Sequence, residues 1–171
     1  MKNRSLTLQK AIYYNIEGVG TAMKSEQPQI ETYGERQVPA FGYELLRNVL
    51  LPELLGDEIE PILYWAGRKL AKKYPCQTIE EMIDFFERAA WGELDKNGET
   101  KGKIKFELRS DFINARLKDK SVYKFSLESG FIAEQIQNIK GYTADALTEI
   151  KNGRDRRISI EVTLDTKDSI R

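Results

Sequence analysis

The sequence predicts an α+β domain, of the broad α/β class, in which a layer of helices packs on one face of a four-stranded antiparallel sheet. Two patterns indicate this class. Between residues 38 and 90, apolar side chains recur every three or four positions, which is typical of amphipathic helices. In residues 103–109 and 158–165, apolar and polar side chains alternate strictly, which is typical of strands with one buried face. Strands with one polar face favour an antiparallel sheet that helices cover from one side.

The first predicted helix covers residues 41–50, where the apolar positions form one stripe. Pro52 is expected to end or kink this helix, because proline has no backbone N–H and its ring clashes with the preceding turn. Gly56 is a natural stop, since glycine is the usual residue after a helix end.

Two further helices follow. The second begins either at Asp57 or at Glu60, which a proline follows as a suitable first helical residue, and it ends at Tyr74. The third begins at Thr78, which is expected to form a capping box with Glu81.

The rest of the chain is predicted to hold the sheet and a fourth helix. The elements with a clear pattern are strands over residues 103–109, 144–150 and 158–165 and a helix over residues 125–139. Residues 92–102 are rich in Gly, Asp and Asn and are interpreted as turns, and Asn152-Gly153 marks the turn between the last two strands. The predicted order is three helices, two strands, one helix and two strands.

The chain length of 171 residues suits a single domain. Residues 36–171 are predicted to form that α+β domain, and residues 1–35 an N-terminal extension of uncertain structure. Within the extension, residues 6–16 fit either a helix or a strand, and glycines and a proline interrupt the polar stretch that follows.

The composition excludes several kinds of chemistry. The chain has no histidine and one cysteine, Cys76. Ser-His-Asp and Cys-His catalysis and histidine-containing zinc sites are therefore excluded, and one cysteine builds neither an internal disulfide nor a metal cluster. The common phosphate-binding glycine motifs are also missing. We predict that the protein is not an enzyme and has no catalytic residues, no cofactor and no metal site.

The charges and hydropathy predict the kind of partner and the compartment. Lys+Arg and Asp+Glu both number 27, whereas a nucleic-acid-binding protein usually carries a basic surplus. No segment approaches the roughly 18 apolar residues that cross a bilayer, and residues 1–10 lack the apolar centre of a signal peptide. Together with the single cysteine, these features predict a cytoplasmic protein that binds no nucleic acid and spans no membrane.

Four aromatic residues and one glycine are candidates for contact with a ligand or partner. They are Trp65, Gly67, Trp91, Phe125 and Phe131. Aromatic residues at helical spacing mostly belong to the core, which is the alternative for each of them. Trp65 differs because it lies off the centre of the stripe that Ile62, Ala66 and Leu70 form on its helix. Gly67, close by, would allow another helix to approach closely.

We therefore predict a homodimer through residues 41–74, with Trp65 in the contact. The basic side chains of the second helix are interpreted as a solvated face: Arg68, Lys69, Lys72 and Lys73. The acidic side chains of the third helix are interpreted in the same way: Glu80, Glu81, Asp84 and Glu87. Cys76 is interpreted as a structural or surface thiol rather than a reactive one.

Four ordered segments carry a resemblance to a known family. They are FGYELLR with the following LP (residues 41–52), YWAGRKLA (64–71), FFERAAWG (85–92) and LESGFIAEQI (127–136). These segments resemble the YslB family, bacterial proteins of unassigned function, and the resemblance covers roughly residues 38–165. That family in turn resembles the vinyl-reductase-type ligand-binding domain, whose relatives include subunits of TRAPP transport particles.

The resemblance implies a helical layer on a four-stranded antiparallel sheet, dimerisation, and an apolar ligand between helices and sheet. The chain lacks the cysteines of the larger group near its last strands, so no metal or thiol role is implied. The leading interpretation is a non-enzymatic intracellular module that homodimerises and holds a small apolar ligand. The alternative is a protein–protein adaptor with a fully packed core and no ligand. A cavity of roughly 300 Å³ or more would favour the ligand.

Overall fold

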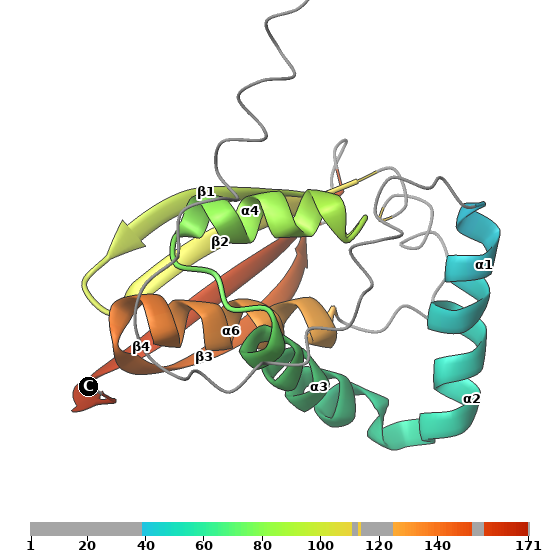
Figure 1. The fold of residues 1–171 in the computed structure, drawn as a ribbon, viewed down its shortest axis with the longest axis horizontal. Coiled ribbons are helices and arrows are strands. Elements are labelled where there is room, and N and C mark those ends of the chain that lie inside the picture. Colours follow the sequence, from blue (N-terminus) through green and yellow to red (C-terminus); the bar gives the residue numbers. More distant parts are fainter. Residues whose placement is uncertain (1–38, 111–112, 114–124, 152–155, 171) are drawn as a thin grey trace, which may run out of the picture. The chain divides into compact units, whose positions relative to one another are not determined.

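The computed structural model describes residues 39–110, 113, 125–151 and 156–170 (Figure 1). All of them belong to one compact unit of the chain, Thr32–Arg171. The predictions for residues 1–35 and for the turn at residues 152–153 lie outside the described residues.

The described elements follow the predicted order. The helices are α1 (Ala40–Glu44), the π-helical η2 (Leu45–Leu50), α2 (Leu51–Leu55), the 3-10 turn η3 (Gly56–Glu58), α3 (Ile59–Lys73), α4 (Ile79–Arg88) and α6 (Ser126–Lys140). The strands are β1 (Glu93–Thr100), β2 (Lys103–Arg109), β3 (Tyr142–Lys151) and β4 (Arg157–Ser169). They form one antiparallel sheet in the order β1-β2-β4-β3, on which α4 and α6 pack (Figure 1). The predicted fold class is confirmed.

The first helical stretch is longer than predicted. α1, η2 and α2 run on without a break, and we call residues 40–55 the arm. Of the two expectations for Pro52, an end or a kink, the end is wrong: the helix continues, and a π-helical turn lies directly before Pro52, in which the N–H of Leu51 donates to the carbonyl of Leu46. This wider turn leaves room at the carbonyl that a proline ring would otherwise meet. The predicted stop at Gly56, whose φ is +54°, is confirmed.

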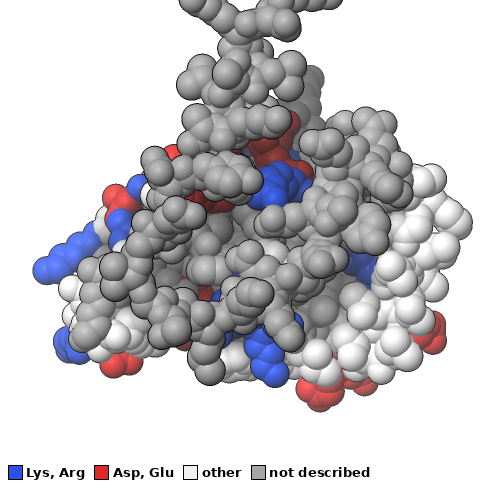
Figure 2. All heavy atoms as spheres, viewed as in Figure 1, with Lys and Arg blue, Asp and Glu red and all other residues white. Residues whose placement is uncertain are grey.

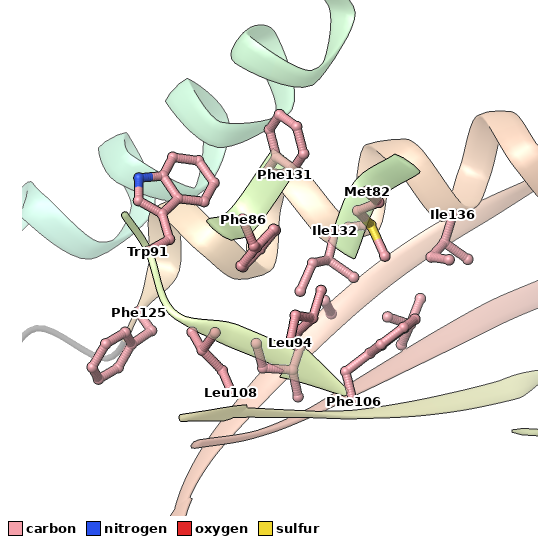
Figure 3. Packing of buried hydrophobic residues seen from close by; sticks show 14 of the residues in the cluster. Met82, Phe86, Trp91, Leu94, Phe106, Leu108, Phe125, Phe131, Ile132 and Ile136 are labelled. Carbon is pink, nitrogen blue, oxygen red and sulfur yellow. The ribbon is translucent and has the colours of Figure 1, made fainter. Parts of the chain in front are cut away.

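The buried face of the sheet is the one predicted from alternation. Ile104, Phe106 and Leu108 of β2 lie opposite Val162, Ile160 and Ile158 of β4, and all six side chains are fully buried. Figure 3 shows side chains of β1 and β2 pointing toward the aliphatic and aromatic residues of α4 and α6.

The interpretation of residues 92–102 as turns was wrong, because most of them form β1. This strand lies at the edge of the sheet and pairs only with β2. Leu94 alone is buried in it, and the pairing is irregular between Lys96 and Gly98. An edge strand with a single buried side chain needs no alternation of apolar residues, so its sequence resembles a turn.

The helix α6 is the centre of the helical layer. It packs on β3 and β4 and also on α3, and residues 128–136 are all buried. A helix covered on two sides must hold its polar side chains in internal contacts. Those contacts position α3 on the outside of the layer.

Candidate functional site

Two glycines bring α3 and α6 into backbone contact. A Cβ atom added to Gly67 would lie 2.1 Å from the carbonyl oxygen of Leu127, and one added to Gly130 would lie 2.0 Å from that of Tyr64. Neither helix therefore has room for a side chain at the crossing. We expected Gly67 to admit a helix of a partner, but the helix that fills this space is α6 of the same chain.

A buried arginine fixes the orientation of α3. Arg68 Nε donates to Glu134 Oε2 at 2.9 Å, Nη2 donates to Gln137 Oε1 at 2.7 Å and Nη1 donates to the carbonyl of Ala144 at 3.0 Å. The interpretation of Arg68 as part of a solvated face was wrong. The guanidinium is buried because α6 and β3, which are distant in sequence, supply its acceptors.

The side chains of α3 also cover the outer edge of β3. The backbone N–H of Ala146 donates to the Tyr64 hydroxyl at 3.2 Å, and this hydroxyl donates to Asp145 Oδ1 at 3.2 Å. Burial raises the pKa of Tyr64, so its hydroxyl stays protonated and can donate. With the Ala144 carbonyl bound to Arg68, this part of the edge strand is occupied by side chains of its own chain.

The opposite face of α3 carries exposed apolar side chains. Trp65 is 61% exposed, and Ile62 is 43% exposed although the sequence placed it on the apolar stripe of this helix, which was expected to face the core. The Trp65 ring lies edge-on to Tyr64, with 6.1 Å between ring centroids, and 5.6 Å from the Arg68 guanidinium carbon. A shallow hollow of about 370 Å³ lies beside it. Its lining residues are Glu58, Pro61, Ile62, Trp65, Ala66 and Lys69.

The arm exposes a second set of apolar side chains. None of its residues is buried. The large apolar residues that it exposes are Phe41, Leu45, Leu46, Val49, Leu50 and Leu54. In Figure 2 the surface at the right, over the arm, is largely without charge. Arg47 ties the arm to the rest of the domain through an ion pair with the buried carboxylate of Glu128.

The other aromatic candidates lie in the core. Trp91, Phe125 and Phe131 are buried. Phe131 stacks on Phe85 with 4.5 Å between ring centroids and meets Trp91 edge-on at 5.4 Å. These three residues therefore lie in the core, which was the alternative to a ligand or partner contact. Of the candidate side chains, Trp65 is the one at the surface.

Cys76 is a buried thiol at the end of α3. Its backbone N–H donates to Gln135 Oε1 at 2.9 Å, and Gln135 Nε2 donates to the carbonyl of Tyr74 at 2.7 Å. Burial, and to a smaller extent the carboxylate of Glu81, raises the pKa of Cys76 to about 11. Both effects favour the neutral thiol, which is the unreactive form.

We expect Cys76 in the folded protein to react with iodoacetamide at pH 8 about 100-fold more slowly than in the denatured chain, because the thiolate fraction falls tenfold for each unit by which its pKa rises. The rate of alkylation, followed by mass spectrometry with and without urea, measures this. Equal rates in the two states would contradict the buried position of the thiol.

The described residues offer no metal cluster and no spanning helix. Within residues 39–110, 113, 125–151 and 156–170, no three His, Cys, Asp or Glu side chains gather closely enough to hold a metal ion. In the same ranges no helix has both the length and the apolar content to cross a membrane.

Comparisons with known proteins assign the family. Residues 40–163 match the family described as "Protein of unknown function (DUF2507)". The chain belongs to this family. The uncharacterized protein YslB of Bacillus subtilis (strain 168) is 38% identical over 149 residues, which cover 86% of this chain and 100% of YslB. The predicted resemblance to YslB is confirmed.

Two other matches are more limited. The crystal structure of a vinyl-4-reductase family protein from Methanocaldococcus jannaschii superposes with a TM-score of 0.55 at 18% identity, over 76% of this chain and 83% of that chain. This likeness shows a shared fold. Casein kinase I homolog 3 of Saccharomyces cerevisiae is 41% identical over 44 residues, which are 26% of this chain and 8% of the kinase homolog. So short a match shows no common family.

Proposed function

We propose that this DUF2507 protein is a non-enzymatic cytoplasmic module that forms homodimers through residues 41–74. The observation that supports this most strongly is the arm, a helical stretch with no buried residue and six large apolar side chains in water. Contiguous apolar surface of this kind marks a contact site on a folded protein. Trp65 and Ile62 extend the apolar surface onto α3.

The chemistry of the arm favours a protein partner over a lipid surface. Helices that bind membranes carry a face rich in Lys and Arg, whereas the charged residues of the arm are Glu44, Arg47 and Glu53. Arg47 is already paired with Glu128. A second copy of the chain is a suitable partner for this surface. The arm and the hollow beside Trp65 lie on the same chain, so a dimer with two-fold symmetry can bury both of them in one interface.

The packing of the interior supports the alternative hypothesis, an adaptor without a ligand, more than it supports an apolar ligand between helices and sheet. Where α4 and α6 meet, the rings of Phe85, Trp91 and Phe131 are in direct contact, with centroids 4.5–5.7 Å apart. The hollow beside Trp65 lies on the outer face of α3, and not between helices and sheet. An apolar ligand between helices and sheet stays a prediction, which native mass spectrometry of the purified protein tests.

Trp65→Glu is expected to convert the dimer into a folded monomer, with a dissociation constant at least about 100-fold higher, because it places a charge in a desolvated contact. Since Trp65 is largely exposed in the single chain, the fold should not depend on it. Light scattering after size-exclusion chromatography gives the mass, and circular dichroism verifies folding.

Leu147→Glu is the matched control, since it introduces the same charge at a leucine of β3 that is 77% exposed and outside residues 41–74. It should leave the dimer intact. A wild-type protein that is monomeric, or a Trp65→Glu variant that dimerises as well as wild type, would overturn the proposed function.

A further inference from the structure

Five exposed side chains form a line along the outer face of α3. They are Glu58, which directly precedes the helix, and Ile62, Trp65, Lys69 and Lys72. Successive members are separated by four, three, four and three residues. Steps of this pattern produce the seam along which two helices pack side by side. The opposite face of α3 packs on α6, and the five side chains of the seam stay exposed among the residues that the structure describes.

The two ends of the seam carry opposite charges. Glu58 lies at the N-terminal end with Asp57 beside it, whereas Lys69 and Lys72 lie at the C-terminal end. Among the described residues, neither Glu58 nor Lys69 forms an ion pair, and Lys72 reaches Glu134 Oε1 at 3.5 Å while remaining 66% exposed. A parallel copy of α3 would bring like charges together, whereas an antiparallel copy would bring opposite charges together.

Resting on the proposed homodimer, we infer that α3 pairs with α3 of a second copy in antiparallel orientation, about a two-fold axis at Trp65. Glu58 lies seven residues before Trp65 and Lys72 lies seven residues after it. The axis therefore places Glu58 of each copy opposite Lys72 of the other, and the two Trp65 side chains opposite each other. The apolar middle of the seam is then buried between two charged contacts.

This arrangement fits the shape and exposure of the seam. The hollow beside Trp65 is lined by residues of the seam and its flanks, so the partner's tryptophan has a recess to enter. Ala66 beside Trp65 is small, which lets the two helix axes approach. Trp65 and Ile62 would otherwise remain in water.

Charge reversal tests the pairing directly. Glu58→Lys alone and Lys72→Glu alone should each weaken homodimerisation at least about tenfold, because each creates two like-charge contacts across the axis. Mixed in equal amounts, the two variants should form a heterodimer nearly as tight as the wild type, since both contacts are then between opposite charges. Native mass spectrometry distinguishes the three dimers when one variant is labelled with nitrogen-15.

A substitute variant and a pair of control variants accompany this experiment. Lys72→Gln, which removes the charge without placing a second carboxylate beside Glu134, replaces Lys72→Glu if that variant fails to fold. Glu80→Lys and Lys101→Glu make the same charge changes at exposed positions outside the seam. This control pair should form homodimers as readily as heterodimers.

The outcomes separate the two proposals. A wild-type dimer whose charge-reversed variants fail to recombine, or recombine no better than the control pair, would overturn the antiparallel pairing and leave the homodimer standing. A tighter complex between Glu58→Lys and wild type than between two wild-type chains would show a parallel pairing instead. A monomeric wild type would overturn the proposed function itself.

Discussion

Gly130→Ala is expected to destabilise the protein by about 3 kcal/mol, the upper part of the usual range for overpacking. The new Cβ atom would lie 2.0 Å from the carbonyl oxygen of Tyr64, and that neighbour is backbone in the middle of α3. Relief therefore requires the two helices to move apart, which would also disturb the contacts of Arg68 with α6 and β3. Urea denaturation followed by circular dichroism measures the change in free energy of unfolding.

Gly42→Ala is the control for this substitution. Gly42 also lies within a helix, α1, but a Cβ atom there would meet nothing within 4 Å. Alanine favours the helix by roughly 0.5–1 kcal/mol over glycine, so this variant should be no less stable than wild type. A Gly130→Ala variant as stable as Gly42→Ala would contradict the close helix crossing.

Arg68→Met is expected to cost about 3–5 kcal/mol, the usual loss when one partner of a buried ion pair is removed. Methionine retains much of the apolar volume of Arg68. Among the described residues, it leaves the buried carboxylate of Glu134 with Lys72 alone, whose Nζ lies 3.5 Å from Oε1. The carbonyl of Ala144 also loses its donor. Adding Glu134→Gln to this variant should recover part of the loss, since the uncompensated charge is then gone.

Arg88→Met provides the comparison for Arg68→Met. Arg88 lies in the last turn of α4 with its side chain exposed, so its replacement should change stability by less than about 0.5 kcal/mol. Thermal or urea unfolding of both variants measures the two changes in the free energy of unfolding. A loss below about 1 kcal/mol for Arg68→Met would mean that the network does not hold α3 in place.

Patterns that depend on neighbouring residues predicted the fold well. The alternation in residues 103–109 identified β2 with its buried face. Thr78 caps α4 as predicted, with the N–H of Glu81 donating to Thr78 Oγ1 at 3.1 Å, but the Glu81 carboxylate accepts from the N–H of Gln77 rather than from that of Thr78. These features arise from local geometry, which the sequence carries directly. β1 was missed because its stability comes from pairing with β2 rather than from its own apolar residues.

The candidate site was predicted only in part, because its contacts join distant segments. Trp65 was singled out for its position beside the helix stripe, and the structure places it at the surface. The burial of Arg68 depends on acceptors 66 to 76 residues away, which helical periodicity does not reveal. One available signal was the presence of Gly67 and Gly130 inside helices, where glycine costs about 1 kcal/mol unless backbones need to meet.

Sedimentation equilibrium of the full wild-type chain tests the central claim, homodimerisation through residues 41–74, most directly. Between about 0.01 and 200 µM, which covers dissociation constants from the nanomolar to the high micromolar range, the average mass should rise toward twice the 19.7 kDa of the chain. The same experiment on Trp65→Glu should shift this rise to concentrations at least about 100-fold higher. A wild-type mass of 19.7 kDa at every concentration would contradict the claim.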